Sequence, residues 1–150
     1  MIIISDVDEI PDVNILTPRK GSYSLVQDMY YYNLTNKLAD RWTLSKMMDY
    51  ESYMKLRDAQ QIRLTNFEHI ENAGWHFSYF GNVKYIQFKM QTFGYQTGNS
   101  TFSSEEHLIQ NSIDNNKDIY NRDIKFIHTP IHDNNYLPPN YRYFIDKYGV

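Results

Sequence analysis

The chain opens with a short apolar run that leads directly into a group of acidic residues. Residues 1–4 are Met and three Ile, a composition typical of a buried strand, although so short a run is also compatible with a helix. Pro11 ends any regular continuation. If the chain stays extended beyond Ser5, the two-residue period of a strand points Asp6 and Asp8 to the same side. The pattern therefore predicts a strand that ends in paired carboxylates.

Three longer patterns follow this opening. A helical turn is expected within residues 12–21, which contain a Pro and end in a Gly. Residues 23–34 are rich in aromatic and β-branched side chains and predict one long strand. Apolar residues within 44–64 recur at helical spacing, which predicts a helix over at least residues 50–62.

Residues 73–81 form an aromatic segment between two glycines. Trp75, Phe77 and Tyr79 alternate with His76 and Ser78, as in a strand with one polar face. The glycines at either end allow close approach of another backbone. We therefore expect a strand here.

The last third of the chain predicts two helices and an irregular tail. Asn82 can cap a helix over residues 83–93, and Ser103 with Glu106 forms a capping-box pattern before a second helix. Beyond that helix the chain is expected to be irregular, with a turn at residues 137–141.

Composition narrows the class of protein. A chain of 150 residues is long enough for one domain with a core, and its 14 Tyr and 8 Phe supply large amphipathic side chains. Lys plus Arg number 15 against 18 Asp plus Glu, a net charge of -3, so nucleic acid is not an expected partner. No apolar stretch approaches the ~20 residues of a membrane span. We expect no membrane segment and a soluble, cytoplasmic chain of microbial or viral origin, with the lumen of the secretory pathway as the alternative.

The acidic segment is the main candidate for chemistry. The chain has no cysteine, so a metal would have to use oxygen or imidazole ligands. Like-charged Asp6 and Asp8 are tolerated where water solvates them or where Mg²⁺, Mn²⁺ or Ca²⁺ lies between them, so an acidic turn and a metal site both stay open. Arg57 and Arg63 fall on a charged helix and are interpreted as solvated surface residues.

Segments far apart in the chain together resemble one enzyme family. They resemble the C-terminal half of the family 17 glycosyltransferases, the β-1,4-mannosyl-glycoprotein 4-β-N-acetylglucosaminyltransferases and their microbial and viral relatives. The similarity runs through DVDEIP at 6–11, AGWHFSYFG at 73–81, FKM at 88–90, KDIYNR at 117–122 and LPPNY at 137–141.

The resemblance implies an α/β, GT-A-like nucleotide-diphospho-sugar transferase fold. In such a fold a D-x-D motif closes a strand and holds a divalent metal ion against the diphosphate of the donor. Asp8 would then ligate Mn²⁺ or Mg²⁺, and Asp6 would face the metal, a metal-bound water or the ribose. Glu9 would lie just behind them in the nucleotide-sugar site.

The aromatic segment would line the sugar pocket in the same scheme. Gly74, Trp75 and His76 are the expected nucleotide-sugar-binding residues, with burial in the core as the equal alternative for Trp75. Tyr95 stands where many microbial members carry a histidine. The catalytic base is left open among the acidic residues Asp49, Glu68 and Glu71.

The implied function is metal-dependent transfer of N-acetylglucosamine from a UDP-sugar donor to a mannose-containing glycan acceptor, with inversion. The alternative is a non-catalytic carbohydrate-binding or structural remnant. Because the chain begins almost on the D-x-D motif, residues 1–150 are expected to be a single, incomplete domain, the C-terminal half of the fold. Self-association or a second chain would then complete the sheet beside residues 2–4.

Overall fold

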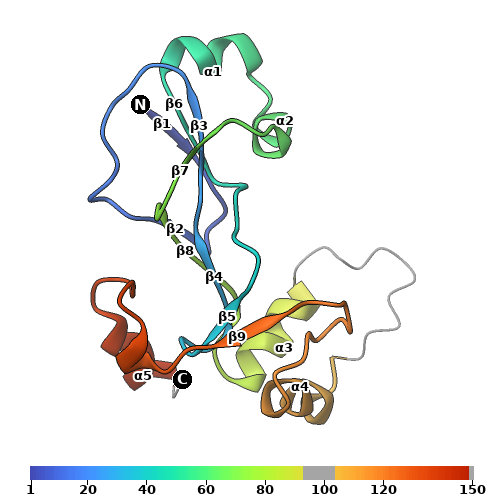
Figure 1. The fold of residues 1–150 in the computed structure, drawn as a ribbon. Helices are drawn as coiled ribbons and strands as arrows, with labels where there is room; N and C mark the ends of the chain where they lie inside the picture. Colours follow the sequence, from blue (N-terminus) through green and yellow to red (C-terminus); the bar gives the residue numbers. More distant parts are fainter. Residues whose placement is uncertain (93–103, 149–150) are drawn as a thin grey trace. The chain divides into compact units, whose positions relative to one another are not determined.

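The computed structural model describes residues 1–92 and 104–148 and shows a mixed α/β fold with two sheets (Figure 1). The strands are β1 (Ile2–Ile4), β2 (Glu9–Pro11), β3 (Ser22–Leu25), β4 (Asp28–Tyr32), β5 (Asn36–Leu38), β6 (Lys46–Met48), β7 (Glu68–Ile70), β8 (Gly74–Phe80) and β9 (Phe126–His128). The helices are α1 (Tyr50–Leu56), α2 (Ala59–Leu64), α3 (Val83–Thr92), α4 (Glu106–Asp114), the 3-10 helix η1 (Ile131–Asp133) and α5 (Tyr141–Tyr148). None of the helices in the described part of the chain has the length and apolar character needed to cross a membrane.

The chain divides into two compact units, each made of two separate stretches of sequence. The first comprises Met1–Met29 and Asp40–Phe77, and the second comprises Tyr30–Ala39 and Ser78–Val150. The unit boundaries fall inside β4 and β8, so both strands belong partly to each unit.

The first unit contains a four-stranded sheet in the order β1-β6-β3-β7. β6 is antiparallel to both β1 and β3, while β3 and β7 are parallel, so the sheet is mixed and β1 lies at its edge. Leu25, Met47 and Ala73 form its buried core, because the apolar residues of these strands face the same interior.

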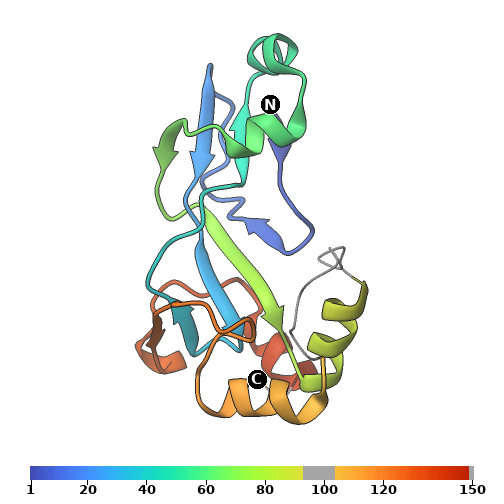
Figure 2. The same ribbon diagram turned by 90° about the vertical axis from the view of Figure 1, so that its right-hand side faces the viewer.

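The second sheet has the order β2-β8-β4-β5-β9. The long strand β8 runs beside β4 (Figure 2), and β4, β5 and β9 follow as antiparallel neighbours. In the second unit, the phenol ring of Tyr31 packs against Tyr32, Tyr79 and Phe126.

Three sequence predictions are confirmed. The opening run forms β1, the aromatic segment forms β8, and a helix begins directly after Asn82. The Asn82 side chain accepts a hydrogen bond from the Tyr85 amide at 3.0 Å, which is the expected N-cap.

Two predictions are wrong because the chain breaks where a continuous element was expected. The predicted strand over 23–34 is two strands, separated at Gln27, which pairs instead with Trp42. The predicted helix over 50–62 is two short helices, because Arg57 adopts a left-handed backbone with φ 58 that ends α1. Asp58 then starts α2 by accepting a hydrogen bond from the Gln61 amide at 3.0 Å.

The C-terminal predictions had mixed outcomes. The irregular tail was a wrong prediction, since it contains β9, η1 and α5. The second predicted helix is present as α4, with Glu105 at its N-cap. Ser103, on which the capping-box prediction depended, and Tyr95 lie outside the described residues.

Candidate functional site

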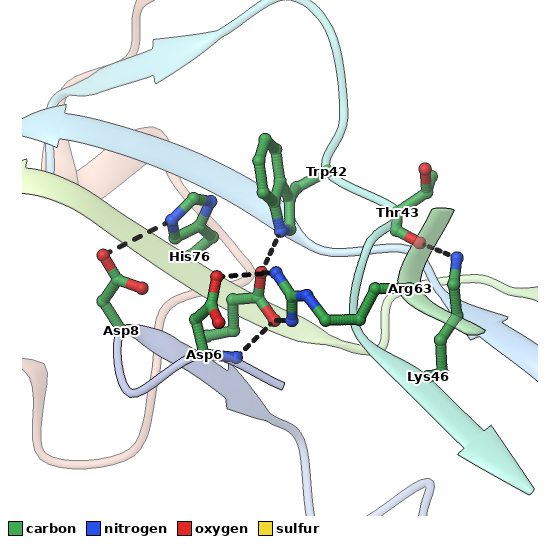
Figure 3. A network of polar contacts seen from close by, with 8 residues as sticks. Asp6, Asp8, Trp42, Thr43, Lys46, Arg63 and His76 are labelled. Carbon is green, nitrogen blue, oxygen red and sulfur yellow. Dashed lines mark hydrogen bonds and ion pairs between the residues drawn. The ribbon is translucent and has the colours of Figure 1, made fainter. Parts of the chain in front are cut away.

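The acidic segment forms a closed turn between β1 and β2. The Glu9 amide donates to the Asp6 carbonyl at 3.1 Å, and the Asp6 amide donates to the Glu9 carboxylate at 2.9 Å. The chain is therefore not extended beyond Ser5, and the expectation that the strand period would align Asp6 with Asp8 is wrong. Figure 3 shows that the two carboxylates have different partners, Arg63 for Asp6 and His76 for Asp8.

Arg63 on α2 binds two of the three carboxylates. Its Nη1 and Nη2 donate to the two oxygens of Glu9, both at 2.8 Å, and Nη2 also donates to Asp6 Oδ2 at 2.6 Å (Figure 3). The Arg63 side chain is 10% exposed and that of Glu9 0%. The interpretation of Arg63 as a solvated surface residue is therefore wrong, whereas Arg57 is exposed as expected.

Glu9 is held by four donors in all. Besides Arg63 and the Asp6 amide, Trp42 Nε1 donates to Glu9 Oε1 at 2.5 Å. Burial by itself raises the pKa of Glu9, but the hydrogen bonds from Arg63, Asp6 and Trp42 outweigh it and lower that pKa below the ordinary value. Glu9 is thus a buried, ionised anchor for the turn. Sequence reasoning missed Trp42, because no local signal relates it to an acid 33 residues away.

Asp8 lies beside His76 of β8. The distance from Asp8 Oδ2 to His76 Nε2 is 3.6 Å, and the Asp8 side chain is 21% exposed while that of His76 is 7% exposed. The Asp8 carbonyl accepts from the Phe77 amide at 2.9 Å, which fixes the Asp8 backbone against β8. The indole of Trp42 covers the imidazole, with ring centroids 4.4 Å apart.

The pairing of β2 with β8 brings the two predicted site segments together. Its register sets Glu9 opposite His76, Ile10 opposite Trp75 and Pro11 opposite Gly74. Gly74 has φ +132, and a Cβ there would lie 2.1 Å from the Ile10 carbonyl oxygen. A glycine is needed at this position because the two backbones are too close for any side chain.

Lys46 extends the polar network at the edge of the site (Figure 3). Its Nζ donates to Ser24 Oγ at 2.9 Å and to the Thr43 carbonyl, although the residue is only 2% exposed. Burial lowers the pKa of Lys46, nearby Arg63 lowers it further, and Glu9 opposes both effects.

The other candidate residues have different positions. Trp75 is 3% exposed and lies in the interior. Of the residues considered as a base, Asp49 caps α1 through the Ser52 amide at 2.7 Å and Glu71 pairs with Arg41 at 2.6 Å. Glu68 is exposed on β7. The structure thus brings Asp6, Asp8, Glu9 and His76 into one network and leaves the base unassigned.

The network carries an excess of negative charge. Asp6, Asp8 and Glu9 contribute three carboxylates, and Arg63 is the guanidinium that contacts two of them. Among the residues that the structure describes, no three or more His, Asp or Glu side chains are grouped so as to hold a metal ion by themselves. Comparisons with protein-family models, with curated proteins and with solved structures found no match to this chain.

Proposed function

We propose that this chain is a metal-dependent glycosyltransferase domain of GT-A type. The reaction is transfer of N-acetylglucosamine from a UDP-sugar to a mannose-containing glycan, the activity implied by the family 17 resemblance. One observation carries the proposal. The resemblance is most specific in the DVDEIP and GWHFSYF segments. Strand β2, at the end of the first, pairs with β8 in the second, with Glu9 opposite His76.

The residues present fit a divalent cation shared with a bound diphosphate. Glu9 is buried and bound by Arg63 and Trp42, and Asp6 pairs with Arg63. Asp8, beside His76, is the residue to which the resemblance assigns the metal. Asp8 is partly exposed and lies at the edge of a cluster whose carboxylates outnumber its contacting guanidinium. Mn²⁺ or Mg²⁺ held there by Asp8, with Asp6 as the second candidate, would neutralise the departing UDP.

The other residues of the network have supporting roles in this proposal. Arg63 and Glu9 fix the turn so that Asp8 stays in place. Because the turn is already held by these bonds, the site is preorganised and need not rearrange when the donor binds. His76, next to Asp8, is suited to hydrogen-bond a phosphate or a sugar hydroxyl. Gly74 allows β2 to approach β8 closely enough for this arrangement.

The proposal is tested by calorimetric titration of Mn²⁺ with UDP into the wild-type chain and into Asp8→Asn. We expect binding in the wild type and at least a tenfold weaker affinity in Asp8→Asn. Glu51→Gln on α1 removes an exposed carboxylate of the same unit and is the matched control, which should bind like the wild type. Equal affinity in wild type and Asp8→Asn would contradict the assignment of Asp8.

An activity assay completes the test. The chain is incubated with UDP-N-acetylglucosamine, Mn²⁺ and a mannose-containing acceptor, and release of UDP is followed together with the glycosylated product. Turnover that is lost in Asp8→Asn would support the transferase. Glycan binding without any turnover would instead support the carbohydrate-binding alternative.

A further inference from the structure

Two buried polar groups near Trp42 lack hydrogen-bond partners. Both amide atoms of Gln27 and Nδ1 of His76 are buried and unpaired in the described part of the chain. Gln27 is 0% exposed and His76 5% exposed. Buried polar atoms without partners are few in native proteins, and an ordered water is a common explanation for them.

The backbone places these groups beside the same indole ring. Gln27 and Trp42 exchange both backbone hydrogen bonds, with the Gln27 amide donating at 2.8 Å and the Trp42 amide donating at 3.0 Å. In an antiparallel pair of this kind, the two side chains project from the same face. The Trp42 ring in turn lies 4.4 Å from the His76 ring (Figure 3). Trp42 is therefore the neighbour that Gln27 and His76 share.

We propose that one buried water molecule bridges Gln27 and His76. The water accepts a hydrogen bond from the Gln27 amide nitrogen and donates one to His76 Nδ1. This satisfies atoms that otherwise have no partner, and the amide oxygen of Gln27 is available to a second proton donor. A water with two or more polar partners is the usual occupant of such a site.

The bridge determines where the imidazole proton resides. A neutral imidazole has one donor and one acceptor nitrogen, so a water that donates to Nδ1 requires the proton to be on Nε2. Nε2 is the atom that faces Asp8 at 3.6 Å. Gln27 is thus a positioning residue that makes His76 present an N–H to Asp8. This inference does not depend on sugar transfer, because it concerns only the hydrogen bonds of the resting protein.

The test is the tautomer of His76, observed by long-range nitrogen–proton correlation NMR on histidine-labelled protein. Spectra are recorded at about pH 8.5, above the ordinary titration range of histidine, and the His76 signals are assigned by their loss in His76→Gln. We expect the wild type to show the proton on Nε2 alone. We also expect a cross-relaxation signal between His76 and a long-lived water.

Gln27→Met keeps the length of the side chain but removes the amide. We expect it to convert the single tautomer into a mixture of both and to abolish the water signal. The matched control is Asn36→Leu, which removes another buried amide that also lacks partners but belongs to the second unit, and it should leave His76 unchanged.

Three results would overturn the proposal. They are a wild-type proton on Nδ1, a wild-type His76 without a water contact, and a single unchanged tautomer in a folded Gln27→Met. The first two do not depend on the Gln27 variant, so they decide the matter even if that variant does not fold.

Discussion

Arg63 and Glu9, 54 residues apart in the chain, form a buried ion pair in which Arg63 Nη1 donates to Glu9 Oε2 and Nη2 donates to Oε1, each at 2.8 Å. Such a two-bond pair is geometrically specific, because the planar fork of arginine matches the carboxylate. It connects α2 to the start of β2 and fixes the turn that carries Asp6 and Asp8.

Removing Arg63 is expected to destabilise the protein strongly. Arg63→Met leaves the Glu9 carboxylate buried without its counter-charge, which costs about 3–5 kcal/mol for pairs of this kind. The measurement is urea unfolding followed by circular dichroism. The control is Arg57→Met, at the exposed end of α1, which should change the free energy of unfolding by no more than about 0.5 kcal/mol. Similar effects of the two substitutions on the free energy of unfolding would show that the buried pair stabilises the protein no more than an exposed arginine does.

Glu9 is also expected to make the free energy of unfolding fall at acid pH. Its pKa is lower in the folded protein than in the unfolded chain, because the hydrogen bonds outweigh burial. The stability it contributes is therefore fully present above the unfolded pKa, near the ordinary value of 4.5, and is lost as the pH falls through the folded pKa. Urea unfolding between about pH 6 and pH 3 should show a steeper loss in the wild type than in Glu9→Gln. Parallel curves would rule out this role for Glu9.

Lys46 is expected to give a pH dependence of the same sign as Glu9, but at higher pH. Burial, and then Arg63, lower its folded pKa below the ordinary 10.5, so between the two values the unfolded chain binds more protons than the folded one. Stability gained from this group therefore rises with pH through that window. The wild type should gain stability relative to Lys46→Met as the pH is raised from about 7 to about 10.5. A difference between the two proteins that stays constant with pH would contradict this expectation.

Gly74 is expected to tolerate no side chain. In Gly74→Ala the new Cβ would lie 2.1 Å from the Ile10 carbonyl oxygen, which is part of the backbone and can move only if β2 separates from β8. We expect a loss of about 3 kcal/mol or more in the free energy of unfolding, from the clash and the positive φ together.

Gly21→Ala is the control for the positive φ alone. Gly21 has φ +98, but the nearest atom to an added Cβ is the Tyr23 hydroxyl oxygen at 3.7 Å. We expect a loss of about 1 kcal/mol, due only to the backbone conformation. If both variants lost the same stability, close packing of β2 on β8 would not be what requires Gly74.

The sequence allowed prediction of the elements whose signals are local. β1, β8 and the Asn82 cap were recognisable because apolar runs, alternation and capping residues act within a few positions. The break at Gln27 was not recognisable, since it depends on pairing with Trp42. The three-residue strands in the rest of the chain are too short to show a period.

The sequence singled out part of the candidate site, but neither Arg63 nor Trp42. Asp6, Asp8, Glu9 and His76 were singled out as a possible metal and nucleotide-sugar site, and the structure places them in one network. That Arg63 balances the carboxylates could not be predicted, because a guanidinium on a charged helix is usually solvated. The break between α1 and α2, at a left-handed Arg57, likewise carries no clear sequence signal.

The division of the chain into interleaved units has a consequence for its synthesis on the ribosome. All residues of the first unit, up to Phe77, have been made before most of the second unit exists. The first unit can therefore begin to fold before Tyr30–Ala39 can pack. That segment belongs to the second unit, whose remaining residues come later in the chain. The hydroxyls of Tyr31 and Tyr32 bond to Arg122 and to the Lys117 carbonyl, so these two hydrogen bonds can form only after that later segment has been translated.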